Sequence, residues 1–237
     1  MFTLGVILAR AGSKGLPNKC LRPLRGRPVI EYTFDHAQEA RHLDAVALST
    51  DCPEVIRLAQ MRGIACIERP ARLADDTARL DDALRHAVYE HETRCAHETN
   101  LVVMLYGNVP VRRPGIIDEG VQHLIETGAD SVQTVAPVGK HHPDWMFRLH
   151  HDRMNPVRPN PHYRRQDLEP LYLLDGGLTV MTRSALFGAT DNPDEPHAFL
   201  GRDRRAIVVA PHDTVDVDEP IDLHLAEAIL AARAARP

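Results

Sequence analysis

Several features that define other protein classes are scarce in this sequence. Its 4 cysteines are scattered without C-x-x-C spacing, so neither a disulfide framework nor a cysteine zinc site is expected. The longer apolar runs, such as Leu101 to Tyr106, are far too short to cross a bilayer. The first residues lack the basic segment of a signal peptide. We therefore expect a cytoplasmic protein with no membrane partner.

Charge and composition narrow the class further. The chain has 28 basic and 33 acidic residues, so binding to nucleic acid through a net basic surface is not expected. Hydrophobic residues make up 43% of the 237 residues, which is ordinary for a globular protein and argues against intrinsic disorder. This length suits one α/β domain with a buried core.

Short apolar runs alternate with amphipathic segments along most of the chain. This alternation predicts an α/β fold, doubly wound, with a mainly parallel sheet and helices on both faces. The expected strands are 2–9, 45–49, 64–67, 101–106, 131–135, 177–181 and 206–209. The expected helices are 28–40, 53–62, 76–92, 114–126 and 218–232. Gly63 and Gly128 are placed as C-terminal stops of two of these helices.

The alternation breaks between Val138 and Leu171, a stretch dense in proline, histidine and arginine. Within it, 145–147 and 154–157 are expected to form the strands of a hairpin. We interpret 138–171 as a hairpin-rich insertion in a single domain, 1–237, that covers the substrate site or meets a partner subunit.

The most informative segment runs from Ala9 to Lys19, directly after the first expected strand, where an open α/β sheet presents its ligand crevice. Its cations and glycines are Arg10, Gly12, Lys14, Gly15 and Lys19. Glycines let the backbone approach phosphates closely, and the cations suit a polyanion. The spacing matches neither a Walker A loop nor a dinucleotide fingerprint. A turn with solvated basic residues is the weaker interpretation, because three cations alternate with two glycines.

Asp216 and Asp218 are separated by one residue. They lie at the end of an expected strand, just before the last expected helix. Two carboxylates on one side of an extended segment suit a hard cation that bridges triphosphate oxygens. Alternatively, Asp218 caps the helix that begins at Glu219, which is a common use of aspartate. From the residues alone the cap is favoured.

The loop Arg10-Ala11-Gly12-Ser13-Lys14-Gly15-Leu16-Pro17, followed by Lys19, resembles the signature of the acylneuraminate cytidylyltransferases, which make CMP-activated sialic and related acids from CTP. Further segments that fit in order are 27–33, 49–51, 69–77, 142–143, 165–168 and 216–223. The resemblance spans nearly the whole chain, and its first and last motifs are the specific ones. It implies the Rossmann-like fold of the nucleotide-diphospho-sugar transferases.

The resemblance also implies a role for individual residues. Lys19 and Arg10 would be the catalytic cations that stabilise charge on the phosphates. Mg²⁺ would be the cofactor, held by Asp216 and Asp218. The nucleotide would contact Ala9, Gly12, Ser13, Lys14, Arg69, Asp76 and Thr77. The acidic acceptor would contact Tyr106, Asn108, Arg165, Gln166 and Asp175. Arginine suits bidentate recognition of a carboxylate, and Arg164 competes with Arg165 for that role.

This chain departs from the family pattern at several positions. Cys20 stands where an asparagine is usual, and a small buried cysteine is favoured there over a reactive thiol. Tyr106 replaces a glutamine, and 108–109 replace two hydroxyl residues. Asp175-Gly176-Gly177 replaces Asn-Gly-Ala. These changes predict an acceptor other than the commonest sialic acid; the alternative that the changed residues only pack beneath the pocket has nearly equal weight.

The predicted function is transfer of CMP from CTP to a nonulosonic acid of the sialic, legionaminic or pseudaminic type, with release of pyrophosphate. One alternative is the same transfer to a phosphonate or a 3-deoxy-octulosonate. Another is a nucleotide-binding regulator without catalysis, against which intact Lys19, Asp216 and Asp218 argue. Apolar residues 145–147 among prolines, together with the resemblance, predict a homodimer formed through the insertion.

Overall fold

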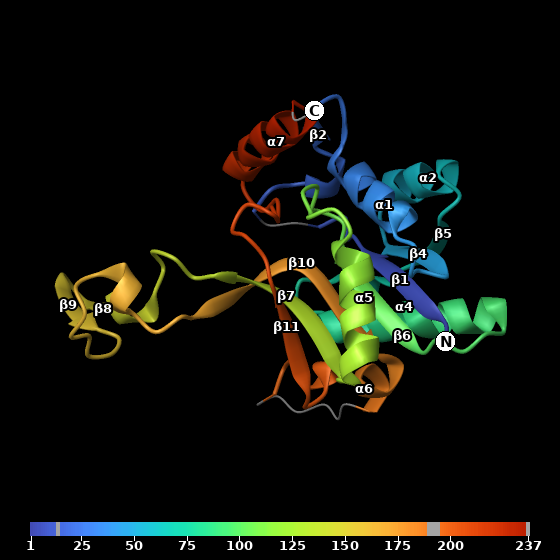
Figure 1. The fold of residues 1–237 in the computed structure, drawn as a ribbon. Helices are drawn as coiled ribbons and strands as arrows, with labels where there is room; N and C mark the ends of the chain where they lie inside the picture. The colour runs from blue at the N-terminus through green and yellow to red at the C-terminus, as the bar shows by residue number, and fades with distance from the viewer. Residues whose placement is uncertain (13–14, 189–194, 236–237) are drawn as a thin grey trace.

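A seven-stranded sheet in the order β11-β7-β10-β6-β1-β4-β5 forms the centre of the computed structural model, which describes residues 1–12, 15–188 and 195–235 (Figure 1). The strands are β1 (Thr3–Leu8), β4 (Ala45–Thr50), β5 (Ala65–Glu68), β6 (Leu101–Tyr106), β7 (Ser131–Pro137), β10 (Tyr172–Thr182) and β11 (Arg204–Val208). All neighbours are parallel except β10, which is antiparallel to both β6 and β7. The expected mainly parallel sheet is confirmed.

Helices cover both faces of this sheet, as expected for a doubly wound fold. The helices α1 (Val29–Glu39), α2 (Pro53–Met61) and α5 (Ile116–Thr127) pack on one face. The helices α4 (Leu80–Cys95) and α6 (Arg183–Gly188) pack on the other, with the 3₁₀ turn η4 (Ala198–Leu200). Because both faces are buried, the strands carry almost continuous apolar runs instead of alternating polar and apolar residues.

Short elements at the carboxyl edge of the sheet complete the body. After β1 come the 3₁₀ turn η1 (Lys19–Leu21) and the hairpin β2 (Pro23–Leu24) and β3 (Arg27–Pro28). The last helix, α7 (Pro220–Ala234), packs on this hairpin and α1 through a small apolar cluster. The end of the chain therefore lies close to the loop that follows the first strand (Figure 1).

Two helices begin later than expected, for local reasons. A helix was predicted from residue 76, but 75–79 form turns after the short helix α3 (Ala71–Ala74), and α4 begins at Leu80. The Asp75 carboxylate accepts hydrogen bonds from the backbone N and the hydroxyl of Thr77, and such local bonds compete with a helix. The last helix was predicted from residue 218, but it begins at Pro220 with Glu219 as N-cap.

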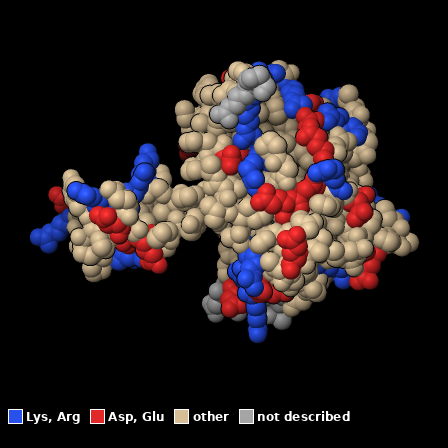
Figure 2. All heavy atoms as spheres, in the orientation of Figure 1, with Lys and Arg blue, Asp and Glu red and all other residues tan. Residues whose placement is uncertain are grey.

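The residues 138–171 form an arm that projects away from the sheet (Figure 1). It carries η2 (Pro143–Trp145), β8 (Phe147–His150), β9 (Arg153–Pro156) and η3 (Arg165–Asp167). The predicted hairpin is present, but its first strand starts at Phe147, because Trp145 belongs to a 3₁₀ turn. Figure 2 shows the arm as a separate lobe on a narrow neck, with side chains of both charge signs.

Within the described ranges, no helix is long and apolar enough to span a membrane.

Candidate nucleotide, metal and acceptor site

At one edge of the sheet, the loops that follow β1, β4 and β6 meet the extended segment that carries Asp216 and Asp218. The Asp51 carboxylate, after β4, accepts a hydrogen bond from the backbone N of Ala11 at 2.8 Å. A Cβ added to Gly15 would lie 2.8 Å from the carbonyl oxygen of Asp218, so this approach of two backbones requires glycine. The glycine-containing loop is thus held against both β4 and the two-aspartate segment. The segment 49–51 was identified from the sequence only by its resemblance to the family, and this bond was not predicted.

Residues of the loop predicted to contact the nucleotide lie where a phosphate could approach. Ala9 is buried, and its N–H bonds the carbonyl of Ser49 at 3.1 Å, which anchors the start of the loop. A Cβ on Gly12 would meet no atom of the described residues within 4 Å, so the Gly12 backbone has open space beside it in that part of the chain. Ser13 and Lys14 lie outside the described residues.

The two predicted catalytic cations are each paired with an acidic residue that was itself predicted to belong to the site. The Nζ atom of Lys19 lies 2.6 Å from Oδ1 of Asp218, and Nη1 of Arg10 lies 2.6 Å from Oδ1 of Asp76. All four side chains keep some exposure, and Asp218 is the most exposed at 66%. These pairs can therefore exchange partners when a polyanion and a metal enter.

Cys20, next to Lys19, is the small buried cysteine that was favoured. Its side chain is buried, and burial raises the pKa of the thiol to about 12, although the Lys19 ammonium opposes the rise. A thiol of this kind stays protonated and is a poor nucleophile.

Asp216 and Asp218 form the acidic half of the site. Burial, with repulsion from the Asp218 carboxylate, raises the pKa of Asp216 to about 6. The side-chain amide of Asn108 donates to Oδ1 of Asp216 and, at 3.1 Å, to the carbonyl of Val217. Asn108 was predicted to contact the acceptor. In the structure its side-chain amide holds the Asp216 carboxylate in place.

The cap expected from Asp218 is supplied by other residues. The side chains of Glu219 and Asp222 form a capping box at the start of α7, and Asp222 also accepts from the backbone N of Asp218 at 2.9 Å. The Asp218 carboxylate is left for Lys19 and for a ligand. Two carboxylates and no third acidic, histidine or cysteine ligand among the described residues suit Mg²⁺, which takes its other ligands from water and substrate phosphates.

Residues predicted to recognise the base lie next to the start of the loop, where Asp76 pairs with Arg10 and Arg69 bonds Ser49. Arg69 is 7% exposed and donates to the hydroxyl and the carbonyl of Ser49 at 3.1 and 2.9 Å. Burial lowers the pKa of Arg69, which the Asp51 carboxylate partly offsets. Thr77 is turned to Asp75, so its hydroxyl is already bonded. Arg69, Asp51, Arg10 and Asp76 therefore outline one wall beside the loop.

A cavity of about 830 Å³ adjoins Asp216, and we call it the acceptor cavity after the predicted role of the residues that line it. Tyr106 and Asp175 line it, and Arg165 reaches it from η3 at the base of the arm, together with Lys140. Gln166 is exposed on η3 and Asn108 is buried, and neither lines this cavity. The cations Arg165 and Lys140 at the rim suit an acidic small molecule, and the Asp216 carboxylate lies on the side of the predicted metal site.

Asp175 sits in an irregular stretch of β10, where the pairing register with β7 shifts. Its Oδ1 accepts from the hydroxyl of Thr134 and from the backbone N of Gly177. Its Oδ2 is buried and has no hydrogen-bond partner within the described residues. A Cβ on Gly177 would lie 2.6 Å from the Thr214 hydroxyl, so the alanine usual in the family would clash here.

Arg112 is a residue that sequence reasoning did not assign to the site. It is 2% exposed, and its guanidinium donates to Gly177 O, Thr33 Oγ1, Val109 O and Tyr106 O at 2.7 to 3.0 Å. Burial lowers its pKa to about 9, which is still high enough to keep the charge at neutral pH. Arg112 fixes the backbone on both sides of the acceptor cavity. Its sequence signal was an arginine six residues after the expected strand 101–106, aligned with the arginine that the family carries in the same segment.

The fold and the site define an α/β enzyme of the nucleotidyltransferase class, in which a glycine-containing loop faces two aspartates at the carboxyl edge of the sheet. The sequence profile of the cytidylyltransferase family matches residues 4–148. The chain belongs to this family.

Individual relatives agree with this assignment. An N-acylneuraminate cytidylyltransferase of Streptococcus agalactiae is 31% identical over 75% of this chain and 43% of its own length, so the chain spans less than half of that relative. A CMP-N,N'-diacetyllegionaminic acid synthase of Legionella pneumophila is 28% identical over 97% of both chains. A CMP:2-keto-3-deoxy-manno-octonic acid synthetase solved with CTP has the same fold, with a TM-score of 0.72 over 98% of this chain at 22% identity.

Proposed function

We propose that this chain transfers CMP from CTP to a hydroxyl of a small acidic acceptor, a nonulosonic acid of the sialic, legionaminic or pseudaminic type, and releases pyrophosphate. The observation that carries this proposal is the meeting of Lys19 and the glycine-containing loop with Asp216 and Asp218, beside a cavity with Arg165 at its rim. Relatives whose names include N-acylneuraminate cytidylyltransferase and CMP-N,N'-diacetyllegionaminic acid synthase support the same chemistry.

In the proposed reaction the acceptor oxygen forms a bond to the α-phosphorus of CTP while the bond to the β-phosphate oxygen breaks. The acceptor hydroxyl loses its proton, and pyrophosphate leaves with the electrons of the broken bond. Negative charge grows on the phosphate oxygens, so positioned cations lower the barrier. Lys19 and Arg10 supply such cations once they leave Asp218 and Asp76 for the triphosphate.

The two aspartates would hold Mg²⁺, with Asp216 kept in place by Asn108 and Asp218 exposed toward the loop. When bound, the ion supplies positive charge to the phosphate oxygens. Arg69 and the turn that carries Asp76 and Thr77 would enclose the cytosine. Ser13 and Lys14 are proposed to contact phosphate as well.

On the acceptor side, the Arg165 guanidinium would bind the carboxylate in two parallel hydrogen bonds. Tyr106 and Asp175 would contact the sugar, with Gln166 at the outer rim. Arg112 holds the carbonyls of Tyr106 and Gly177, so it positions the pocket without touching substrate.

We also propose that the chain forms a homodimer through the arm. Leu149, Met154 and Tyr163 on the arm are 69%, 61% and 96% exposed, which is unusual for large apolar side chains on a monomer. The base of the arm lines the acceptor cavity, so a partner held by the arm would help to close the site.

A pyrophosphate-release assay with each nucleoside triphosphate and a panel of acids tests the proposed function. Turnover is expected with CTP and Mg²⁺ and is expected to stop with EDTA. Equal turnover of UTP or ATP would refute the cytidine assignment, and full activity in EDTA would refute the metal role of the aspartates. Tight CTP binding without turnover of any acid would support the regulator instead.

A further inference from the structure

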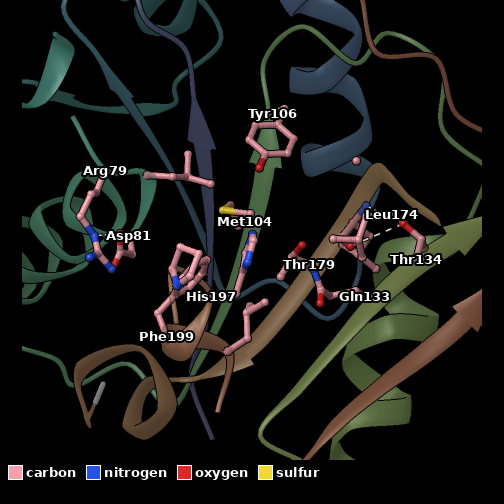
Figure 3. Close-up of a pocket in the computed structure, with 15 residues that line it drawn as sticks. Arg79, Asp81, Met104, Tyr106, Gln133, Thr134, Leu174, Thr179, His197 and Phe199 are labelled. Carbon is pink, nitrogen blue, oxygen red and sulfur yellow. Dashed lines mark hydrogen bonds and ion pairs between the residues drawn. The ribbon is translucent and has the colours of Figure 1, made fainter. Parts of the chain in front are cut away.

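Two segments of the chain, 138–142 and 165–171, join the arm to the sheet, and we call them the neck (Figure 1). Each carries one cation of the acceptor cavity: Lys140 comes from the outgoing segment and Arg165 from the returning one. Another part of the cavity wall belongs to the sheet, where Figure 3 shows Tyr106 on β6. An acid that binds both cations therefore depends on how the two neck segments lie relative to one another.

The backbone pairing of the sheet ends where the neck begins. The N–H of Val138 donates to the carbonyl of Leu171 at 3.0 Å, directly after the last paired residues of β7 and β10. Beyond that bond, no backbone hydrogen bond among the described residues joins 138–142 to 165–171. The rest of the neck is therefore held together by side chains.

His142 supplies a side-chain link between the two segments. Within 138–171, all of which the structure describes, His142 and Leu168 are the only buried residues. The Nε2 atom of His142 donates to the carbonyl of Glu169 at 3.0 Å, across the neck. Its Nδ1 accepts from the backbone N of Asp144 at 3.2 Å and so caps the turn η2. Both ring nitrogens are thus satisfied by a neutral imidazole with its proton on Nε2.

The bond from Nε2 is the one that bears on the acceptor cavity. It joins the outgoing segment just after Lys140 to the returning segment just after Arg165. Neither cation makes a side-chain hydrogen bond or ion pair within the described part of the chain, so the backbone that carries them sets their position. The bond from Nδ1, by contrast, orders a turn that leads out into the arm.

We propose that His142 is a positioning residue of the acceptor site: it ties the two neck segments together, so that Lys140 and Arg165 face one acidic acceptor at the same time. The inference rests on the proposed function. It also gives a physical reason for the segment 142–143, where the sequence resembles the family, because histidine links the neck and Pro143 begins the turn η2.

Two amide variants separate the roles of the two ring nitrogens. The amide nitrogen of glutamine stands as many bonds from Cα as Nε2 of histidine does, and the amide oxygen of asparagine as many as Nδ1. His142→Gln should therefore keep the bond to Glu169 and lose the cap of η2. His142→Asn should lose the bond to Glu169 and keep the cap, because asparagine is a preferred N-cap residue.

Steady-state kinetics with CTP and N,N'-diacetyllegionaminic acid, each varied in turn, measure the effect on the acceptor site. KM for the acid should rise about tenfold in His142→Asn and stay near the wild-type value in His142→Gln. KM for CTP should stay unchanged in both variants, because the neck cations line the acceptor cavity. The control His162→Ala, at an exposed position of the arm, should change neither constant.

Fluorescence gives the opposite order of effects. Trp145 is the only tryptophan of the chain and lies in η2, where its backbone N bonds the carbonyl of His142 at 2.9 Å. Its emission should shift in His142→Gln, which loses the cap, and stay as in wild type in His142→Asn.

An equal KM for the acid in His142→Asn and His142→Gln would overturn the inference, as would a KM for CTP that rises together with it. A melting temperature lowered equally in both variants, with a proportionate loss of activity, would mean that His142 only stabilises the arm. If no acid supports pyrophosphate release, the proposed function fails. Calorimetric titration with the same acid then decides the inference: binding that is weakened by His142→Asn and kept by His142→Gln supports it, and no binding overturns it.

Discussion

The Nζ atom of Lys19 lies 2.6 Å from Oδ1 of Asp218, although the two residues are 199 positions apart in the chain. The contact joins the turn after the first strand to the segment before the last helix. Under the proposed function, Lys19 must leave Asp218 before it binds phosphate, and Asp218 must leave Lys19 before it binds a metal ion. Because the pair is partly exposed, its own contribution to stability is small and exchange is easy.

Lys19→Ala should lower kcat by about two orders of magnitude or more, since a fixed cation near the developing charge is lost. The melting temperature should hardly change, because the Lys19–Asp218 pair is partly exposed and contributes little to stability. Arg41→Ala is the matched control: Arg41 is 89% exposed and should tolerate the change in both assays. A large loss of melting temperature with a proportionate loss of activity would mean that Lys19 is structural.

Asp216→Asn should abolish Mg²⁺-dependent activity yet stabilise the metal-free protein above pH 6. The folded-state pKa of Asp216 is raised from 3.8 to about 6, so the native state binds the proton more tightly and loses stability as pH rises through that window. The gain from the variant should be on the order of 3 kcal/mol at pH 8. Chemical denaturation in EDTA at pH 4 and pH 8 measures it.

The gain should shrink as pH falls from 6 to 4 and vanish well below pH 3.8, where Asp216 is protonated in both states. Equal unfolding free energies of variant and wild type at pH 8 would show that the Asp216 carboxylate is not destabilised by its surroundings. Added Mg²⁺ and CTP should stabilise wild type and not the variant.

Asp51→Ala should raise KM for CTP roughly tenfold, because the carboxylate no longer holds the N–H of Ala11 and the loop loses its shape. Asp44→Ala removes a similar bond, from the Asp44 carboxylate to the backbone N of Thr3, at the opposite end of the first strand. That control should reduce the melting temperature and leave KM for CTP unchanged. The same rise of KM in both variants would assign the effect to general loosening of the strand.

Arg165→Ala should raise KM for the acceptor about tenfold or more and leave KM for CTP unchanged, since a bidentate bond to a carboxylate is lost. Arg164→Ala is a neighbouring control, because Arg164 is exposed and does not line the acceptor cavity. Steady-state kinetics with each substrate varied in turn separate the two constants. An unchanged acceptor KM in Arg165→Ala would contradict the assignment.

The arm should hold two chains together in solution. Sedimentation velocity at micromolar protein should show about twice the 26.5 kDa of one chain, and Leu149→Asp with Met154→Asp should shift it to the monomer. A wild-type protein that sediments as a single chain would refute the dimer.

Local patterns were enough to predict most of the sheet and its helices. Apolar runs such as Leu101 to Tyr106 and stops such as Gly128, whose φ is 64°, depend on residues that are close in sequence. The antiparallel direction of β10 was not predicted, because a buried strand reads the same in either direction. Nor was the turn at Asp75, where a side chain competes with the helix for backbone groups.

The candidate site was predicted unevenly for a similar reason. Its loop and its two aspartates stand in short motifs, so they could be found from sequence. The packing of distant segments brings Asn108 into hydrogen-bond contact with Asp216. It also brings Arg112 to the carbonyls of two loops, so neither contact could be predicted from local sequence. A cavity of about 310 Å³ between β6, β7, β10 and η4 is lined by residues from several separate elements, so no single stretch of sequence predicts it.

Transfer of CMP from CTP to an acid is tested most directly by following the α-phosphate of CTP. The protein is incubated with CTP labelled at the α-phosphorus, Mg²⁺ and an N-acylated nonulosonic acid. The products are then separated, and their masses are measured by mass spectrometry. We expect label in a CMP ester of the acid, with one pyrophosphate released for each ester formed. Label that stays in CTP with every acid offered, or equal transfer from labelled UTP, would contradict it.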